Sequence, residues 1–358
     1  MYKIKQQPED FIVKEIPLAI ATTKPESGPY LYFKLKKRNW NTLDAIKGIA
    51  FQLHCKLNKI GFAGSKDRQA VTEQLISIIG RSKEQVLKIK TPGISLEYSH
   101  SGKEPFTLGS HAGNKFEIII RNLDEDNINN NKLEEINKTH YCENYFDEQR
   151  FSTNNVNIGR FIVKKKFKQA VELIDQQKVK DYLKLKQNDA IGAMRLLPVR
   201  LLRMYVNSYQ SYLWNETVKR YLEQFKVVKK IDYSLGELIF ISKEDQNKMI
   251  DLQIPLIGFD SEKLELKIEP KYELIKTIIK QIMKEEELYY RDFIIKQIPP
   301  ISLEGELRPV FIEVKAFEIS EIENDELNED KKKVKVSFSL GKGSYATMVI
   351  RRVVSEGL

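Results

Sequence analysis

Cysteine and histidine are scarce in this sequence. Its 358 residues include two cysteines, Cys55 and Cys142, which lie far apart and form no Cys-x-x-Cys pair. Four histidines occur without the spacing of metal ligands. These absences argue against a structural zinc site, and we expect no metal. Two isolated thiols are typical of a reducing compartment, so we expect a cytoplasmic protein.

Long apolar runs and nucleotide-binding loops are also missing. The N-terminus lacks the apolar stretch of a signal peptide, and no apolar run is long enough to span a bilayer. We therefore expect no association with membranes. The dinucleotide fingerprint Gly-x-Gly-x-x-Gly is absent, and Gly341-Lys342 lacks the spacing of a phosphate loop. The sequence thus predicts no small-molecule cofactor.

Positive charge, by contrast, is in excess. The chain has 59 Lys and Arg against 50 Asp and Glu, a net charge of +9 and a pI near 9.1. Such a surplus favours a polyanionic partner such as RNA or DNA, although simple solubility is an alternative explanation. The length and the hydrophobic content of 41% are sufficient for two domains with separate cores.

The periodicity of apolar residues changes twice along the chain. Period-two alternation predicts strands over 11–16, 30–37, 75–79, 94–98, 116–120 and 334–340. Helical spacing predicts a helix over 43–57, with Thr42 as its N-cap, and another over 198–225. We therefore expect an α+β fold, with a sheet domain formed by 1–165 and 308–358 and a mostly helical insert over 166–307.

The strand predicted over 30–37 carries aromatic and basic side chains on one face and apolar ones on the other. Further cations and an indole follow it, at 36–40. Clusters of basic and aromatic residues bind phosphates and stack on bases. Edge strands also carry lysine for solubility, so a solvated edge strand is an equally valid interpretation.

The segment from Gly61 to Thr72 combines glycines with a charged triplet. Asp67 lies between Lys66 and Arg68 in the sequence. Glycines let the backbone approach a ligand closely, and opposite charges favour an ionised carboxylate. An ionised, positioned Asp can act as a nucleophile or a base, and the cations can hold a phosphate. A surface turn with a solvated ion triplet would show the same residues.

Four separated motifs resemble the TruD family of tRNA pseudouridine synthases. The segment 61–74 resembles the family signature Gly-Phe-Ala-Gly-x-Lys-Asp-Arg-x-Ala-Val-Thr-x-Gln. The others are Lys-x-x-Pro-Glu-Asp-Phe-x-Val-x-Glu at 5–15, Asn-Tyr-Phe-x-x-Gln-Arg-Phe at 144–151 and Gly-Ser-Tyr-Ala-Thr at 343–347. All four stand in the family's order and together span almost the whole chain.

Three positions depart from the family pattern. Asp147 and Ser152 stand where the family usually has glycine, and Gly341 stands where it often has proline. Asp and Ser tolerate fewer backbone conformations than glycine, so the loop around 147–152 is where the structure is expected to differ. The spacing from Arg150 to Gly159, followed by Lys164, resembles the archaeal branch of the family more than the bacterial one.

The resemblance implies a fold and a reaction. The fold would be a pseudouridine synthase catalytic domain with a mixed, largely antiparallel sheet, interrupted by an inserted, mostly helical TRUD domain. The activity would be the isomerisation of a uridine in tRNA, mainly uridine-13 and in some members uridine-35. We expect a monomer that binds tRNA and uses no cofactor.

Within the reaction, the resemblance assigns Asp67 as the essential carboxylate. It would attack ribose C1′ or remove a ribose proton, and the sequence leaves both routes open. Lys66 and Arg68 would grip a flanking phosphate or orient Asp67. A non-catalytic RNA-binding protein is the alternative, in which Asp67 has no chemical role; a methyltransferase lacks support because no Gly-x-Gly-x-Gly loop occurs.

The resemblance also predicts the residues that hold the target base. The base must leave its stack to be reached. Phe11, Phe146 and Tyr345 would stack on it, and Asn144 would pair with its edge, because an amide offers both a donor and an acceptor. Each aromatic residue has an alternative fate as part of the core, which is where aromatic side chains are most often found.

Overall fold

The computed structural model describes residues 2–18, 28–125, 140–152, 154–265 and 273–357. Contacts within the chain divide it into two compact units. Unit 1 contains Met1–Cys142, Glu313–Ala346 and Val353–Leu358, and unit 2 contains Glu143–Ile312 and Thr347–Arg352. These contacts place the change of unit at Cys142 and Ile312, whereas the extent of the inserted domain, 166–307, stays a prediction.

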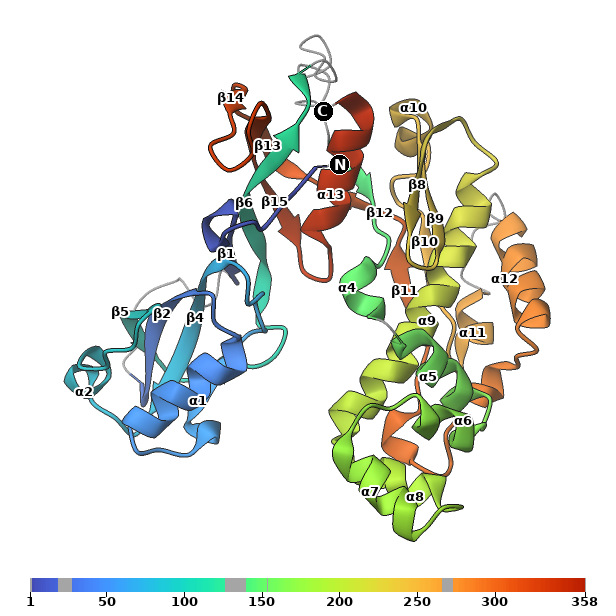
Figure 1. Cartoon of the computed structure of the whole chain (residues 1–358), viewed down its shortest axis with the longest axis horizontal. Helices are drawn as coiled ribbons and strands as arrows, with labels where there is room; N and C mark the ends of the chain where they lie inside the picture. The colour runs from blue at the N-terminus through green and yellow to red at the C-terminus, as the bar shows by residue number, and fades with distance from the viewer. Residues whose placement is uncertain (1, 19–27, 126–139, 153, 266–272, 358) are drawn as a thin grey trace. The chain divides into compact units, whose positions relative to one another are not determined.

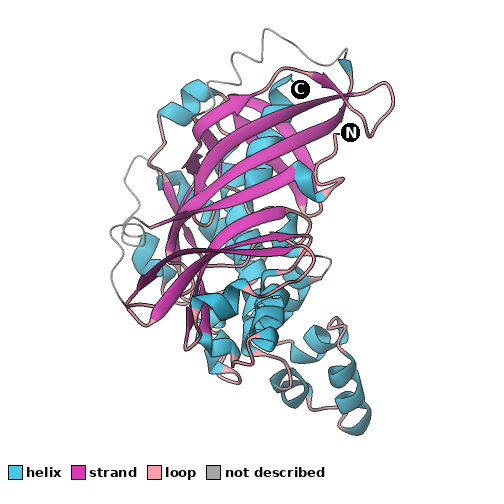
Figure 2. Cartoon of the chain, turned by 90° about the vertical axis from the view of Figure 1, so that its left-hand side faces the viewer, coloured by secondary structure: helices cyan, strands magenta, loops and turns pink. Residues whose placement is uncertain are grey.

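Unit 1 is built on a nine-stranded sheet with the order β13-β15-β6-β1-β4-β2-β5, in which β14 adds to β15 and β3 to β4 (Figures 1 and 2). Strand β1 runs parallel to β4, and the other neighbouring strands run antiparallel. This confirms the predicted mixed, largely antiparallel sheet. The strands are β1 (Phe11–Pro17), β2 (Tyr30–Arg38), β3 (Ile60–Phe62), β4 (Val71–Ile79), β5 (Ile94–Gly102), β6 (His111–Leu123), β13 (Lys315–Ile319), β14 (Glu323–Asn324) and β15 (Lys332–Gly341).

The sheet joins strands from opposite ends of the chain. In β15, Val334 pairs with Ile120 of β6, and Phe338 pairs with Phe116. All four side chains are buried, which is why the alternation over 334–340 was readable as a half-buried strand. The C-terminal strand thus completes a sheet that the first 123 residues begin.

Two helices and two short 3-10 turns accompany the N-terminal half of this sheet. Ile46 and Ile49 of α1 pack against Phe33 and Leu35 of β2 in one buried cluster. The N-cap predicted at Thr42 is wrong: the side chain of Asn41 accepts a hydrogen bond from the amide of Leu43. The helix also ends earlier than predicted. The elements are η1 (Pro8–Asp10), α1 (Thr42–Gln52), η3 (Leu57–Lys59) and α2 (Lys83–Leu87).

Strand β2 lies inside the sheet, between β4 and β5, so the interpretation as a solvated edge strand is wrong. Its exposed cations are fewer than the sequence suggested. Lys37 follows Phe33 and Leu35 on the inward face and has no exposed surface. One lysine predicted to face RNA is therefore inside unit 1.

Unit 2 is organised around α9, whose 24 residues form the longest helix among those described. Helices α5 and α12 pack against it. Trp214 is fully buried on α9 and donates its indole N–H to the carbonyl of Ile254. Six of the seven residues 209–215 are buried, so this stretch of α9 is part of the core of unit 2.

Helices predominate in unit 2, although short strands occur as well. The helices are α4 (Glu148–Phe151), α5 (Asn155–Val163), α6 (Phe167–Glu172), α7 (Gln177–Leu185), α8 (Ala190–Arg195), α9 (Val199–Leu222), α10 (Lys243–Asn247), α11 (Ser261–Glu265), α12 (Glu273–Glu285), η6 (Tyr290–Phe293) and η7 (Pro299–Ile301). The strands β8 (Val227–Tyr233) and β9 (Gly236–Ile241) pair with each other, as do β10 (Gln253–Leu256) and β11 (Glu306–Pro309).

Three further elements contain the residues at which the chain passes from one unit to the other. Strand β7 (Tyr141–Glu143) pairs with β12 (Phe311–Glu313), and α13 (Ala346–Gly357) closes the described chain. None of the described helices combines the length and the apolarity that a bilayer crossing requires.

Candidate active site

Asp67 lies on the loop that joins β3 to β4, residues 63–70, which we call the Asp67 loop. The chain just before Asp67 is held by two buried polar side chains. The amide of Lys66 donates to the hydroxyl of Thr42 at 2.9 Å, and the side-chain amide of Gln74 donates to the carbonyl of Gly64 at 3.0 Å. Thr42 and Gln74 are both buried. The loop is therefore fixed by the core and is not a free surface turn.

The Asp67 carboxylate contacts the ammonium of Lys5. This ammonium lies 2.6 Å from Asp67 Oδ2, and the two side chains are 19% and 28% exposed. The same ammonium lies 4.0 Å from the centre of the Phe11 ring. The sequence had suggested Lys66 and Arg68 as the partners of Asp67. The structure instead brings the first residue of the N-terminal motif onto the Asp67 loop.

Lys66 has a different partner. Its ammonium lies 2.8 Å from Glu15 Oε2, and both side chains are nearly inaccessible, at 6% and 3% exposure. Glu15 also accepts a hydrogen bond from the amide of Leu75 in β4. The pair thus ties the Asp67 loop to β1 and β4. Arg68, by contrast, is exposed.

The side chain of Lys37 contacts the main chain of the Asp67 loop. Its ammonium donates to the main-chain carbonyls of Asp67 and Trp40, each at 2.7 Å, and lies 3.3 Å from that of Lys66. Burial lowers the pKa of Lys37 to about 8, although the charge of Asp67 opposes this shift. The sequence alone did not indicate that Lys37 is buried. The alternation of side chains along a strand nevertheless places Lys37 on the same face as Phe33 and Leu35.

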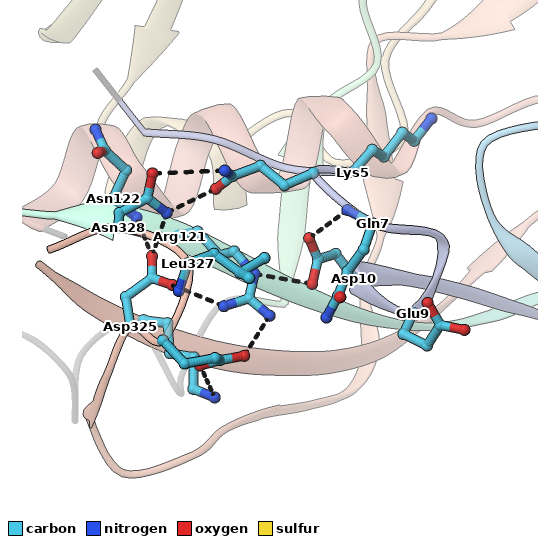
Figure 3. A network of polar contacts seen from close by, with 12 residues as sticks. Lys5, Gln7, Glu9, Asp10, Arg121, Asn122, Asp325, Leu327 and Asn328 are labelled. Carbon is cyan, nitrogen blue, oxygen red and sulfur yellow. Dashed lines mark hydrogen bonds and ion pairs between the residues drawn. The ribbon is translucent and has the colours of Figure 1, made fainter.

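The N-terminal arm that carries Lys5 is anchored by a buried arginine (Figure 3). Arg121 of β6 is fully buried and contacts Asp10 at 2.9 Å and Asp325 at 2.7 Å. Asp10 in turn accepts a hydrogen bond from the amide of Gln7, and Lys3 pairs with Arg121 through the backbone. Both ends of the arm around Lys5 are therefore fixed to the sheet.

The acidic segment before β15 supplies two carboxylates to this network. Glu326 lies 2.9 Å from Arg121. Hydrogen bonds from Arg121 and Lys333 lower the pKa of Glu326 to about 2. Burial raises the pKa of Asp325, but hydrogen bonds from Asn122 and other donors outweigh it, so the pKa is lowered overall.

Two predicted base-binding residues lie in unit 2, where both are enclosed. Asn144 is 2% exposed; its side-chain amide donates to the carbonyl of Pro309, and its side-chain oxygen accepts from Arg308 at 2.7 Å. Phe146 is 6% exposed, and the Arg308 guanidinium lies 4.0 Å from its ring centre. Both polar atoms of the Asn144 amide are thus engaged within unit 2. Arg308 is a candidate that the sequence motifs did not indicate.

The chain matches one family model along nearly its whole length. That model, described as tRNA pseudouridine synthase D (TruD), matches residues 2–181 and 173–353.

The chain belongs to the TruD family.

Relatives of this family cover the chain from end to end. A protein of Methanococcus maripaludis named as a tRNA pseudouridine synthase D is 30% identical over 98% of this chain and 99% of its own length. The tRNA pseudouridine synthase D of Aquifex aeolicus is 28% identical over 98% and 97%. A crystal structure of a TruD protein from Methanosarcina mazei has a TM-score of 0.69 and 26% identity, and the match covers 98% of this chain and 93% of that one. The expected family and fold are therefore confirmed.

The two departures from the TruD glycine pattern have different structural consequences. Asp147 has an extended backbone that any residue adopts, and its carboxylate lies 3.2 Å from Arg351. Ser152 has φ = 47° and ψ = −173°, a conformation that favours glycine. The backbone strain that a missing glycine causes therefore occurs at Ser152 and not at Asp147.

The other TruD-motif residues divide between the units. Tyr345 is partly buried in the turn between β15 and α13, within unit 1. Unit 1 also holds Asp67, Lys66, Arg68 and Phe11, and Phe11 is 3% exposed beside Phe116. The roles of these residues toward a base or a phosphate stay predictions. Within the described residues, no group of His, Cys, Asp and Glu is arranged to hold a metal ion.

Proposed function

We propose that this TruD-family protein isomerises a uridine of tRNA to pseudouridine and that Asp67 is the carboxylate that starts the reaction. The observation that carries the proposal is the contact between Lys5 and Asp67 on a loop fixed by the core. Asp67 keeps 28% of its side-chain surface exposed, so a substrate atom can reach it. A carboxylate held by a cation at a fixed position meets the requirement for nucleophilic catalysis.

The reaction needs only what the RNA and the carboxylate contain. The bond from ribose C1′ to uracil N1 breaks, the base turns, and a bond from C1′ to C5 forms. Overall, the proton on C5 is replaced by the sugar, and N1 gains a proton. Asp67 would either attack C1′ and later leave, or remove a ribose proton and later return it. No oxidant, reductant or group donor enters the balance.

The neighbours of Asp67 supply position and charge in this proposal. Lys5 stabilises the ionised carboxylate, because an opposite charge at 2.6 Å favours the charged form. Lys66 acts through Glu15 by holding the loop, and exposed Arg68 is the triplet member that remains available to a flanking phosphate. The uridine would be flipped from its stack before reaction.

In this proposal Phe11, Phe146 and Tyr345 would stack on the flipped base. Because Asn144 already bonds Arg308 in this structure, we propose that it orients this guanidinium toward the base.

Mapping pseudouridine in tRNA tests the proposed function. The purified protein is incubated with unmodified tRNA transcripts and no cofactor, and pseudouridine is located by chemical mapping at single-nucleotide resolution. We expect modification at uridine-13, with uridine-35 as the second candidate position. An absence of pseudouridine in every transcript would overturn the proposal, whereas protein-dependent binding without modification would favour the non-catalytic alternative.

A further inference from the structure

The positive charge of the chain is concentrated in one short segment of unit 2. Residues 164–203, which we call the basic segment, contain eleven Lys and Arg against four Asp and Glu, a net charge of +7. The whole chain has a net charge of +9. The remainder of the sequence is therefore nearly neutral, and the surplus that suggested a polyanionic partner belongs mainly to this segment.

The basic segment forms a continuous helical surface. It runs from the end of α5 through α6, α7 and α8 to the first turns of α9, and α8 packs against both α6 and α7 (Figure 1). Nine of its eleven cations are exposed. Clustered cations on adjoining helices raise the local potential more than the same number spread over a surface.

The acidic residues of the segment neutralise only a few of these cations. Asp175 lies 2.6 Å from Lys180, and Asp181 lies 3.0 Å from Lys184. The other seven exposed cations have no carboxylate at ion-pair distance among the residues that the structure describes. An evolved solvated helix face usually intersperses both signs, so this excess is available to an anionic partner.

Three of the seven are held in place by main-chain carbonyls. Lys178 donates to Leu196 at 2.8 Å, and Arg195 donates to Gln297 at 2.9 Å. Arg203 donates to Pro300 at 2.5 Å. A carbonyl orders the side chain without cancelling its charge, so less conformational entropy is lost when an anion binds.

We propose that the basic segment is an RNA-docking surface that binds backbone phosphates of the tRNA substrate. This inference rests on the proposed function, and it assigns the segment to affinity and not to chemistry. Phosphate contacts position a nucleic acid without reading its sequence, which suits exposed cations on helix surfaces. An acidic protein partner is the competing occupant.

The test removes four exposed charges of the basic segment: Lys166→Gln, Lys168→Gln, Lys186→Gln and Arg200→Gln in one chain. We expect the Kd for tRNA to rise about 10- to 100-fold at physiological salt. The slope of log K against log salt should become shallower by about 3.6, because each of the four lost phosphate contacts removes about 0.9. The KM should rise with the Kd, while kcat at saturating tRNA stays at the wild-type value.

A matched control changes the same number of exposed lysines on other elements of unit 2: Lys226→Gln, Lys229→Gln, Lys263→Gln and Lys284→Gln. This control should retain most of the wild-type affinity and salt slope. A second variant keeps the charge of the segment, with Lys166→Arg, Lys168→Arg and Lys186→Arg, and should bind as the wild type does. Thermal melting of each variant confirms that it folds.

The outcomes separate this inference from the proposed function. A wild-type protein that forms pseudouridine, together with a fourfold variant whose Kd and salt slope equal those of the control, would overturn the docking surface alone. That result would leave an acidic protein as the partner to be considered. A wild-type protein that neither binds nor modifies tRNA would overturn both. A loss of kcat without a change of Kd would also overturn the docking role.

Discussion

The ammonium of Lys37 lies 2.7 Å from the main-chain carbonyl oxygen of Asp67. A buried cation therefore holds the backbone of the residue whose side chain is proposed to react. The carboxylate of Asp67 is held independently by Lys5, at 2.6 Å. Two lysines from two different segments, β2 and the N-terminal arm, thus fix the main chain and the side chain of Asp67 separately.

Replacing Lys37 should impair turnover more than tRNA binding. In Lys37→Met, the carbonyls of Trp40, Lys66 and Asp67 lose their shared donor inside unit 1, and the Asp67 loop is free to shift. A displacement of about 1 Å at a reacting group can cost about 100-fold in rate. We expect kcat to fall by about that factor while the Kd for tRNA changes little. Single-turnover kinetics and a binding titration measure the two quantities.

Lys36→Met is the matched control, because Lys36 is the neighbouring and exposed lysine on the same strand. It should keep the wild-type kcat. Equal rates for the two variants would show that Lys37 does not position the loop.

The lowered pKa of Lys37 should also affect how the free energy of unfolding depends on pH. The pKa of Lys37 is about 8 in the folded protein, below the value of about 10.4 for an exposed lysine. Between these values, the unfolded chain binds more protons than the folded one, so this group makes the free energy of unfolding rise with pH. Denaturant titrations from pH 7.5 to 10.5 should show a smaller rise for Lys37→Met than for Lys36→Met. The same slope in both variants would contradict the depressed pKa.

The Arg121 network should stabilise the fold at neutral pH and lose this effect in acid. The pKa of Asp325 and that of Glu326 are both lowered in the folded state. The two carboxylates therefore contribute to the free energy of unfolding above the pKa of about 4 that they have in the unfolded chain. This contribution is lost as the pH falls toward 2. The pair Asp325→Asn and Glu326→Gln should lower the free energy of unfolding at pH 7, because the buried Arg121 loses two of its carboxylate partners.

The control for this prediction is Glu329→Gln, an exposed carboxylate in the same segment. Chemical denaturation at pH 7 and pH 2.5 compares the three proteins. The network variant and the wild type should converge at the lower pH. A stability difference that persists unchanged at pH 2.5 would contradict the electrostatic origin of the effect.

Glycine at position 152 should stabilise the protein. Ser152 adopts φ = 47° and ψ = −173°, where a side chain is strained and glycine is not. We expect Ser152→Gly to raise the free energy of unfolding by about 1 kcal/mol. Asn154→Gly is the control, since Asn154 has φ = −130° and caps no amide with its side chain. An equal or lower stability of Ser152→Gly relative to the wild type would refute the strain.

The sequence was informative where one local pattern determines the structure. Strand β15 agrees with its predicted alternation because one face of the sheet is buried along its whole length. The N-cap at position 41 was misassigned because Asn41 and Thr42 are adjacent and both are good caps. Thr42 has a different task, since its hydroxyl accepts from the Asp67 loop. Only the tertiary structure distinguishes these two roles.

The pairings around Asp67 were not predictable from the sequence. The motifs suggested Lys66 as a partner of Asp67, yet Lys66 contacts Glu15, and Lys5 contacts Asp67. Those contacts join residues 51 and 62 positions apart, and no local rule specifies them. Lys37 was interpreted as one of the RNA-facing cations because a fully buried lysine is rare.

The central claim is that the Asp67 carboxylate performs the chemistry. Asp67→Asn keeps the shape of the side chain but removes its charge, so the variant can act neither as a nucleophile nor as a base. Folding and tRNA binding should remain close to those of the wild type, because the loop is held through main-chain contacts that Asn does not alter.

The most direct measurement is pseudouridine formation by Asp67→Asn on the tRNA that the wild type modifies, with thermal melting and a binding titration on the same preparation. We predict a rate at least about 1,000-fold below that of the wild type, with folding intact and with a Kd that is unchanged or slightly lower. A folded Asp67→Asn variant that forms pseudouridine at a rate near that of the wild type would contradict the account.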